Sequence, residues 1–444
     1  MSTITLGKKT LQKNIISSFG LRGVSIICTY IMVPLLIGYL DSYRYGIWMT
    51  IFSMINWFQF FDIGLGNGLR NKFAEAIAVN DKELAKMYVS TAYFLISIIT
   101  LVLFVVFFAS FVFVNWYAVF NVQPSEVSEL NTIILITFGM QIVNFPLKLI
   151  QSVLLGAQKA AMGYSSGTIS NILSLVAIFF LRHFMIGNSL LNVAIIYTFI
   201  NSLIWLIITV YYFLTDFKDV RPSVKYIRRQ YMKGLTGLGV KFFILQINTL
   251  VLISATPLII AHILGQTEVT RYNVMFRLYN IPYMIYFITL TPFWNAFTSS
   301  YAKNNIDWIR KKLLVLVQIW GGLIVFLALL LIFNKPLFKF WVGDKVIPSL
   351  TSGVYLSIYT IVMMLLLPFN FFINGIGKIK LQLYVSCIVT VLNIPLSILL
   401  GGTFKMGLDG IIIANIVCTA PLVIFMAIQT GKILNKKATG IWMA

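Results

Sequence analysis

Residues 14–39 read NIISSFGLRGVSIICTYIMVPLLIGY, and this stretch decides the fold class. It is long enough to cross a bilayer, for which a helix needs about 20 mostly apolar residues. Arg22 nevertheless lies inside it, roughly 12 Å from its start at about 1.5 Å per helical residue. An arginine near the centre of the hydrocarbon costs about 2.5–3.5 kcal/mol, so such a side chain normally faces a bundle interior or a wet cavity. The stretch therefore predicts a membrane helix that also lines a polar space.

The rest of the chain has the same apolar character. Of its 444 residues, 59% are hydrophobic and only 11% are charged, whereas soluble domains have about 25% charged residues. The apolar segments are long and lack a two-residue alternation, which favours helices over barrel strands. We therefore predict an all-α polytopic membrane protein with twelve transmembrane helices. The predicted spans are residues 14–39, 45–65, 88–114, 130–155, 164–182, 190–214, 236–262, 273–297, 313–334, 350–374, 380–400 and 408–430.

The formal net charge of +21 is distributed unevenly. Most of the 34 Lys and Arg residues fall in the loops on the side of the N-terminus. The loops on the opposite side carry only Arg44, Arg182, Arg271, Lys335, Lys339, Lys345 and Lys405. Because positively charged loops stay in the cytoplasm, both termini are predicted to be cytoplasmic. The basic excess then reflects topology and contact with anionic membrane lipids, and no nucleic-acid partner is expected.

The two halves of the chain share short motifs in the same order. The matches pair residues 19–22 with 238–241, 34–37 with 257–260, 78–83 with 302–307 and 156–159 with 375–378. Because each half has an even number of spans, the copies share one orientation, and such repeats are typical of transporters with a path between the halves. We predict two pseudo-symmetric six-helix lobes. The N-terminal lobe covers residues 1–217, a basic cytoplasmic linker covers 218–234, and the C-terminal lobe covers 235–444.

Four basic residues lie inside predicted spans, namely Arg22, Lys148, Lys241 and Arg277. One interpretation is that these long side chains reach the headgroups from near a helix end. The other is a cationic cavity between the lobes that selects anions, phosphates above all, which arginine can hold with two hydrogen bonds. Arg22 and Lys241 occupy matching positions in the repeat, which favours the cavity. We therefore predict that all four residues bind the substrate.

Asp62 lies near the inner end of the second span and begins the glycine-rich run 62–70. This run permits either close helix packing at the membrane exit or a cytoplasmic gate in which Asp62 pairs with Arg70 or Lys72. Asp62 is also the first candidate for ion coupling. Pro34 and Pro257 recur in the repeat and are predicted hinges, because proline interrupts helical hydrogen bonding.

Nothing in the sequence points to catalysis or to a cofactor. Cys28, Cys387 and Cys418 each lie alone in an apolar segment, where a packed thiol is the ordinary role, so no metal site is expected. The glycines of residues 62–70 follow a membrane helix and not a strand, which argues against a nucleotide-binding turn. No Walker motif is present. The chain is predicted to use no cofactor and not to be an enzyme.

Several motifs together resemble a known family. The basic N-terminus before Arg22, the run Asp62-Ile-Gly-Leu-Gly-Asn-Gly-Leu-Arg-Asn-Lys72, the following segment 76–93 and the motif 156–159 are similar to those of bacterial polysaccharide transporters. These are the O-antigen and capsule repeat-unit flippases of the multidrug/oligosaccharidyl-lipid/polysaccharide (MOP) exporter superfamily. The resemblance covers essentially the whole chain. It implies a MATE-like fold whose two lobes alternate between inward- and outward-open forms.

The resemblance also implies a substrate and a location. The substrate would be undecaprenyl-pyrophosphate-linked oligosaccharide repeat units, moved from the cytoplasmic to the outer leaflet of the bacterial cytoplasmic membrane. A glycan polymerase would then be a partner. Arg22 and Lys241 occupy places suited to the basic cavity residues that meet pyrophosphate or acidic sugars in such proteins.

Other functions stay open at this point. A multidrug exporter of the same fold, coupled to H⁺ or Na⁺, would be expected to place Asp or Glu in its cavity, whereas this interior is cationic and poor in carboxylates. A membrane glycosyltransferase or polymerase would need catalytic residues gathered in a sizeable loop, and the longest outer loops, about 115–129 and 335–349, are short. A structural scaffold would leave the repeated intramembrane cations unexplained.

Overall fold

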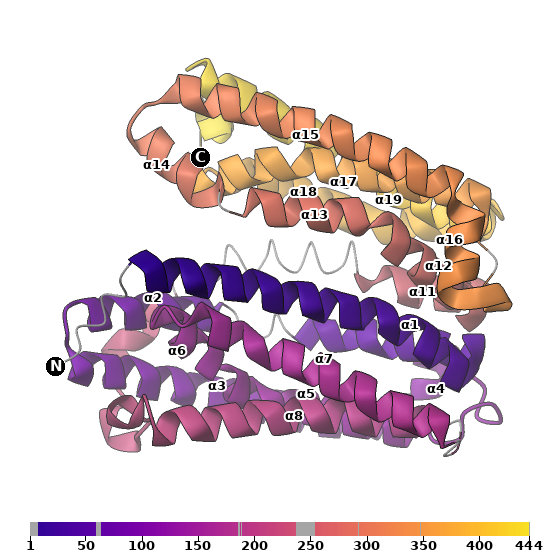
Figure 1. The fold of residues 1–444 in the computed structure, drawn as a ribbon, viewed down its shortest axis with the longest axis horizontal. Helices are drawn as coiled ribbons and strands as arrows, with labels where there is room; N and C mark the ends of the chain where they lie inside the picture. The colour runs from indigo at the N-terminus through magenta and orange to yellow at the C-terminus, as the bar shows by residue number, and fades with distance from the viewer. Residues whose placement is uncertain are drawn as a thin grey trace. The chain divides into compact units, whose positions relative to one another are not determined.

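The computed structural model describes residues 8–58, 64–184, 187, 189–236, 254–291, 293–346 and 348–443. All regular structure in these ranges is helical, so the predicted all-α class is confirmed. The chain divides into two compact units, Met1–Phe243 and Ile244–Ala444. Each unit is a bundle of long helices that lie side by side, as Figure 1 shows for α3, α5 and α8 in unit 1 and for α17, α18 and α19 in unit 2.

Unit 1 contains five helices long enough to cross a membrane together with shorter connecting helices among its described residues. Its elements are α1 (Lys8–Phe58), α2 (Leu65–Ala78), α3 (Lys82–Phe111), α4 (Trp116–Phe120), α5 (Leu130–Lys148), α6 (Ile150–Gly156), α7 (Ala160–His183) and α8 (Leu190–Leu214), followed by three 3₁₀ turns, η1 (Lys218–Val220), η2 (Val224–Tyr226) and η3 (Arg229–Tyr231), and by α9 (Met232–Thr236).

Helix α1 holds the first two predicted spans. Its backbone leaves the helical region at Asp41, where φ is 71° and ψ is 172°. The Asp41 carboxylate accepts a hydrogen bond from the Arg44 backbone N–H at 2.9 Å, which satisfies a donor at the start of the second helical segment. That segment is deeply buried at Tyr45 and Ile47. The break at Asp41 agrees with the predicted gap between residues 39 and 45.

The segment that we predicted as a basic linker belongs to unit 1, where it packs against α3. The Ser223 backbone N–H donates to Ser90 Oγ at 3.0 Å, and the Arg228 N–H donates to Thr91 Oγ1 at 3.1 Å. Both acceptors lie on α3. An ion pair joins Lys82 Nζ to Asp219 Oδ2 at 2.7 Å. The two hydrogen bonds and the ion pair therefore fix residues 218–231 to the first part of α3.

Unit 2 contains four membrane-length helices among its described residues, again with shorter helices between them. Its elements are α11 (Thr256–Leu264), α12 (Gln266–Tyr279), α13 (Ile281–Leu290), α14 (Phe293–Ala302), α15 (Ile306–Ile332), α16 (Asn334–Val342), the turn η4 (Gly343–Lys345), α17 (Leu350–Ile376), α18 (Lys380–Ile398), the π-helical turn η5 (Leu399–Thr403), α19 (Gly407–Leu434) and the 3₁₀ turn η6 (Gly440–Met443).

The core of unit 2 is formed by α17, α18 and α19 together with α13–α15. Two glycines let α19 approach the end of α18 closely. A Cβ on Gly410 would lie 2.6 Å from the Leu400 carbonyl oxygen, and one on Gly401 would lie 2.6 Å from Ile411. Backbones can meet this closely only where side chains are absent, as is common between membrane helices.

Nine helices among the described residues are long and apolar enough to span a membrane. The first of them corresponds to the first two predicted spans, and eight others match one predicted span each. The predicted span 236–262 lies mostly outside the described residues. The predicted span 273–297 is not continuous, because the chain is divided there between α12, α13 and α14, with Pro282 in the first turn of α13. The count of twelve helices stays a prediction.

Candidate functional site

The structure describes most of the predicted site residues but not all of them. Asp62 and Lys241 lie outside the described residues, as does the side chain of Arg22, whose backbone belongs to α1. Within unit 1, the described candidates are Pro34, Arg70 and Lys148; within unit 2, they are Pro257 and Arg277. Their predicted roles are therefore considered separately for each unit.

In unit 1 the clearest candidate is Lys148, the last residue of α5. Its side chain is half-buried, and no carboxylate of a described residue pairs with it. Asn144 and Gln141 lie about one and two turns earlier, which places all three side chains on one face of α5. Asn144 is 1% exposed, and its Oδ1 has no hydrogen-bond partner in the described structure. This face is a buried polar stripe inside an apolar bundle.

The polar stripe ends at a break in the helix. Pro146 has no N–H to continue the helical ladder, and Leu149 separates α5 from α6, its N–H donating to the Pro146 carbonyl at 3.4 Å. Thr209 of α8 satisfies a nearby carbonyl by donating from Oγ1 to Leu147 O at 2.8 Å. Interrupted membrane helices are typical of transport sites, because freed backbone groups and polar side chains meet there. Lys148 thus lies at a position suited to binding an anion.

The glycine-rich run after the second span is used for close packing. Gly64 takes a left-handed conformation (φ 73°) and caps α2. A Cβ on Gly68 would lie 2.0 Å from the carbonyl oxygen of Leu235, and a Cβ on Gly156 would lie 2.8 Å from the carbonyl oxygen of Arg70. Glycine is therefore required at Gly68 for α2 to contact α9, which supports the packing interpretation of this run.

The gate interpretation remains a prediction. Arg70 is exposed on α2, where it is free to meet a carboxylate at the membrane surface. Lys72 is paired with Glu75, its Nζ lying 2.7 Å from Glu75 Oε2, and this hydrogen bond raises the pKa of the Lys72 ammonium. Of the two partners proposed for Asp62, Lys72 therefore has a competing carboxylate, and Arg70 is the better candidate.

In unit 2 the two predicted site residues have different surroundings. Arg277 is half-buried in the last turn of α12. Pro257 lies in the first turn of α11, a position where proline is tolerated because the first N–H groups of a helix have no partner anyway. Pro34, by contrast, lies within α1. The two repeated prolines thus occupy different positions in their helices, and their hinge role stays a prediction.

Unit 2 also has a buried polar network that sequence reasoning missed. Asn393 of α18 donates from Nδ2 to Asn415 Oδ1 of α19 at 2.9 Å, and Asn415 Nδ2 donates to Thr256 Oγ1 of α11 at 3.4 Å. The three residues are at most 2% exposed. Each asparagine stands in an otherwise apolar predicted span, so polar residues other than cations were the signal that would have found this network.

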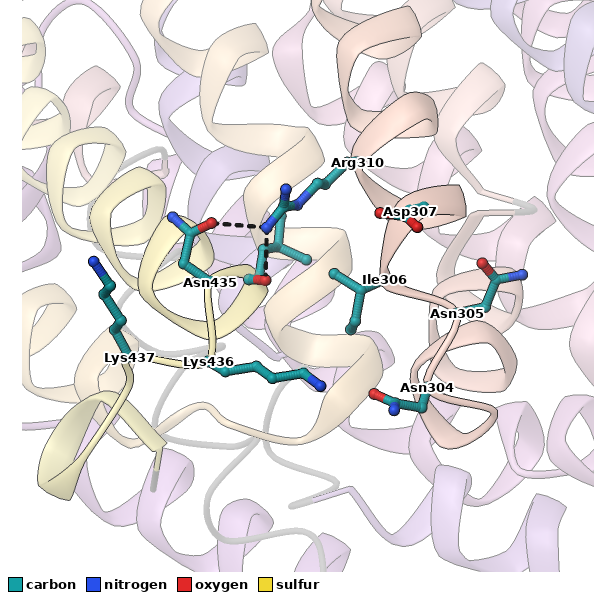
Figure 2. A pocket seen from close by; sticks show the side chains of 9 residues that line it. Asn304, Asn305, Ile306, Asp307, Arg310, Asn435, Lys436 and Lys437 are labelled. Atoms are coloured by element: carbon teal, nitrogen blue, oxygen red, sulfur yellow. Dashed lines mark hydrogen bonds between the residues drawn. The ribbon is translucent and has the colours of Figure 1, made fainter.

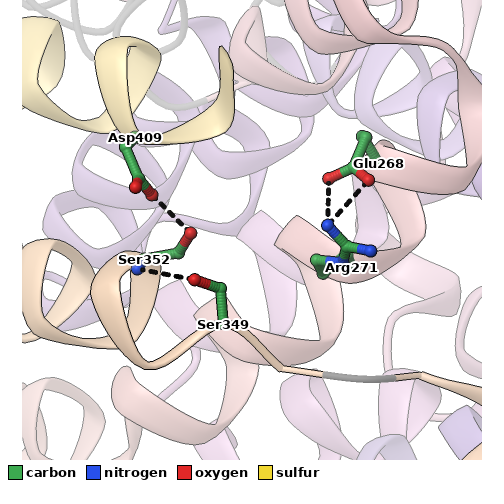
Figure 3. A network of polar contacts seen from close by, with 5 residues as sticks. All are labelled: Glu268, Arg271, Ser349, Ser352 and Asp409. Carbon is green, nitrogen blue, oxygen red and sulfur yellow. Dashed lines mark hydrogen bonds and ion pairs between the residues drawn. The ribbon is translucent and has the colours of Figure 1, made fainter. Parts of the chain in front are cut away.

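The acidic residues of unit 2 lie near helix ends. Figure 3 shows that Ser352 of α17 donates from Oγ to the Asp409 carboxylate in the first turn of α19, while Ser349 Oγ accepts from the Ser352 N–H. Nearby, Arg271 Nη1 pairs with Glu268 Oε1 at 2.8 Å on α12. No group of three or more potential metal-ligating side chains occurs in the described ranges. Of these carboxylates, Glu268 forms an ion pair and Asp409 accepts a hydrogen bond from a serine hydroxyl.

The sequence profile of a family described as polysaccharide biosynthesis protein matches residues 11–294, which is more than half of the chain. A second profile, described as MatE, matches residues 243–399. A relative from Yersinia pseudotuberculosis, whose curated name attributes O-antigen export to it, is 22% identical over 414 residues, which cover 88% of this chain and 87% of the relative.

Solved structures with the same fold are also found. A multidrug resistance MATE family transporter of the MOP superfamily, in its inward-facing conformation, superposes with a TM-score of 0.69 at 14% identity over 95% of this chain and 96% of the other. A MOP superfamily transporter from Pyrococcus furiosus, described as having a binding pocket of reverse polarity, gives a TM-score of 0.63 at 13% identity over 97% and 96%. At these identities the likeness establishes a MATE-like fold alone. With the profile match over more than half of its length, the chain belongs to the family described as polysaccharide biosynthesis protein, and its fold is MATE-like.

Proposed function

We propose that this transporter is a flippase for undecaprenyl-pyrophosphate-linked oligosaccharide repeat units of the O-antigen or capsule type. It would act in the bacterial cytoplasmic membrane with both termini in the cytoplasm, moving the units to the outer leaflet, where a glycan polymerase uses them. The observation that carries the proposal is the half-buried Lys148, which has no carboxylate partner among the described residues and lies at a helix break. A cation in this setting favours a phosphate-bearing substrate over a cationic drug.

The path that we propose is a cationic cavity opened to each side in turn by alternating access. Arg22, Lys148, Lys241 and Arg277 would bind the pyrophosphate, and Pro34 and Pro257 would allow the helices to bend. Asp62 and Arg70 would form the cytoplasmic gate. Two negative charges that move outward across an inside-negative membrane gain about 4.6 kcal/mol per 100 mV. The membrane potential would therefore help to drive export.

Substitution of Lys148 tests the proposal. In a strain that lacks the native gene, Lys148→Met should reduce surface glycan by about thirtyfold or more, as expected when one partner of a buried charge contact is lost. Lipid-linked units should then accumulate on the inner leaflet, and Lys148→Arg should retain part of the activity. Lys225→Met, in the exposed linker, is the matched control. Wild-type glycan display by Lys148→Met at equal membrane abundance would refute the proposal.

A multidrug exporter of the same fold is the second candidate, favoured by the MatE match and by the MATE structures. Exporters of cationic drugs would be expected to hold a carboxylate in the bundle interior. In the described ranges, the carboxylates of the candidate spans lie near helix ends or at the Asp41 break. Drug resistance conferred on a sensitive strain, with no defect in glycan display on deletion, would favour this alternative.

A further inference from the structure

One end of unit 2 carries a cavity whose lining includes none of the residues assigned to the proposed transport path. It has a volume of about 650 Å³ and lies between the loop that connects α14 to α15, the first turns of α15, and the segment that follows α19. Figure 2 shows that Arg310, Lys436 and Asn304 surround it from these three directions. This end is on the side whose loops carry most of the Lys and Arg residues. Because positively charged loops stay in the cytoplasm, we assign this end to the cytoplasm.

The cavity is lined by hydrogen-bond donors that have little to bind within the protein. Arg310 Nη2 donates to Leu434 O at 2.9 Å and to Asn435 Oδ1 at 2.7 Å, which fixes the guanidinium and leaves its Nε and Nη1 without an acceptor in the described structure. Lys436 and Lys437 form no ion pair there. A guanidinium held in place by two hydrogen bonds, together with two lysine ammonium groups that form no ion pair in the described structure, suits a phosphate group.

Negative charge in the cavity does not cancel these cations. Asp307 is the one carboxylate that lines it, and no ion pair joins Asp307 to Arg310 one turn away in the described structure. Three cations against one carboxylate give the lining a charge of about +2. The start of α15 also faces the cavity; Asn305 Oδ1 caps the Trp308 N–H at 3.2 Å, and the positive end of the helix dipole favours an anion there.

A second cavity of about 370 Å³ adjoins the first. The two share Asn304, Ile306 and Lys436 in their linings, and the rest of the second is bounded by Tyr301, Ile433, Ala438 and Met443, so it is less polar than the first. A cationic compartment that continues into a less polar one is complementary to an amphiphile with an anionic head. A free phosphate ion would use only the first compartment.

The surrounding elements place both cavities at the level of the lipid headgroups. The span Ile306–Ile332 begins here and the span Gly407–Leu434 ends here. The chain after α19 is fastened to that helix, because Gln429 Nε2 donates to Trp442 O at 3.0 Å and Lys432 Nζ lies 3.8 Å from the Trp442 ring centroid. Tryptophan at a helix end is typical of the membrane–water interface. The wall that carries Lys436 is therefore built into the bundle.

We propose that these two cavities bind an anionic phospholipid of the cytoplasmic leaflet. Its phosphate lies between Arg310, Lys436 and Lys437, and its glycerol and upper acyl chain lie against Ile433 and Met443. The site is independent of the flippase proposal, because it uses none of the residues assigned to the transport path. A bound lipid would join the start of α15 to the end of α19.

The test is lipid binding by the purified full-length protein in detergent, measured by native mass spectrometry with phosphatidylglycerol, with phosphatidylcholine and with sn-glycerol 1-phosphate. The wild type should bind phosphatidylglycerol in preference to the other two. The double variant Lys436→Gln/Lys437→Gln should bind it about thirtyfold more weakly, as expected for two basic residues near a headgroup. The control Lys405→Gln/Lys335→Gln, which also removes two lysines, should match the wild type; Lys405 and Lys436 share a φ of 56°, so each double variant changes one lysine in this backbone conformation.

Asp307→Asn provides an independent test that does not remove a cation. It takes away the one carboxylate of the lining and should strengthen phosphatidylglycerol binding severalfold. Equal binding of sn-glycerol 1-phosphate would overturn the lipid assignment in favour of a soluble phosphate compound. Equal phosphatidylglycerol binding by the wild type, the double variant and the Asp307→Asn variant would overturn the site itself.

Discussion

Replacement of Gly68 by alanine tests the contact between α2 and α9 most directly. The added Cβ would lie 2.0 Å from Leu235 O and 2.9 Å from Leu235 C, whereas ordinary contacts begin at 3.4 Å. The two backbones would have to separate by 3.4 − 2.0 = 1.4 Å. The obstacle is a backbone carbonyl that cannot rotate away, so we expect the upper part of the usual overpacking cost, about 3 kcal/mol. Alanine recovers about 0.5–1 kcal/mol through its helix propensity, which leaves a net loss of about 2 kcal/mol.

The matched control is Gly139→Ala in α5, because a Cβ there would meet nothing within 4 Å. It should be neutral or slightly stabilising, so the two variants should differ by about 3 kcal/mol. Thermal unfolding of both proteins in the same detergent, followed by tryptophan fluorescence, measures the difference. Equal melting temperatures for the two variants would show that α2 and α9 do not touch at Gly68 and would refute the packing account of the glycine-rich run.

Two further predictions concern polar contacts. Asn415→Leu leaves the buried amide of Asn393 without its acceptor and should lower the free energy of unfolding by about 1–3 kcal/mol. The melting temperature should fall accordingly. The control Val417→Leu, on the exposed side of α19, should leave the melting temperature unchanged. The hydrogen bond from Lys82 lowers the pKa of the Asp219 carboxyl group. The ion pair is therefore fully formed above the ordinary pKa of aspartate. It is lost as the pH falls through the lowered pKa of Asp219. The protection factors of residues 218–231, which compare exchange with the intrinsic rate at the same pH, should therefore fall slightly in strong acid, and Lys82→Ala should lower them at neutral pH. Unchanged exchange in Lys82→Ala would contradict the second prediction.

Long helices were the easiest feature to predict from the sequence. The expected spans 350–374 and 380–400 differ by only a few residues from α17 (Leu350–Ile376) and from α18 with its π-helical turn (Lys380–Thr403). The reason is physical, because an apolar segment of this length in a bilayer must satisfy its backbone groups within itself. Hydropathy is averaged over a window, however, and so it does not show where Pro282 divides the expected span 273–297 into shorter helices.

The docking of residues 218–231 was beyond sequence reasoning for a different reason. Besides the Lys82–Asp219 ion pair, its polar contacts to α3 are single hydrogen bonds from backbone N–H groups to Ser90 and Thr91, more than a hundred residues earlier in the chain. Neither hydroxyl differs in the sequence from the many others that bond within their own helix. Composition therefore predicted a basic cytoplasmic linker, but it could not predict which helix the linker would pack against.

In the candidate site, too, some features can be predicted from the sequence pattern, and others are found only from contacts in the structure. Cations in apolar spans are rare enough to notice, so Lys148 was predicted, whereas the link from Asn393 through Asn415 to Thr256 was not. The two features also differ in energy. The asparagine network satisfies most of its own donors, so a packing role accounts for it. Lys148 has no carboxylate partner among the described residues, and a charge held in that state costs stability. A costly cation that has no carboxylate partner among the described residues is best explained by a ligand that it binds, and for this reason the functional proposal rests on Lys148.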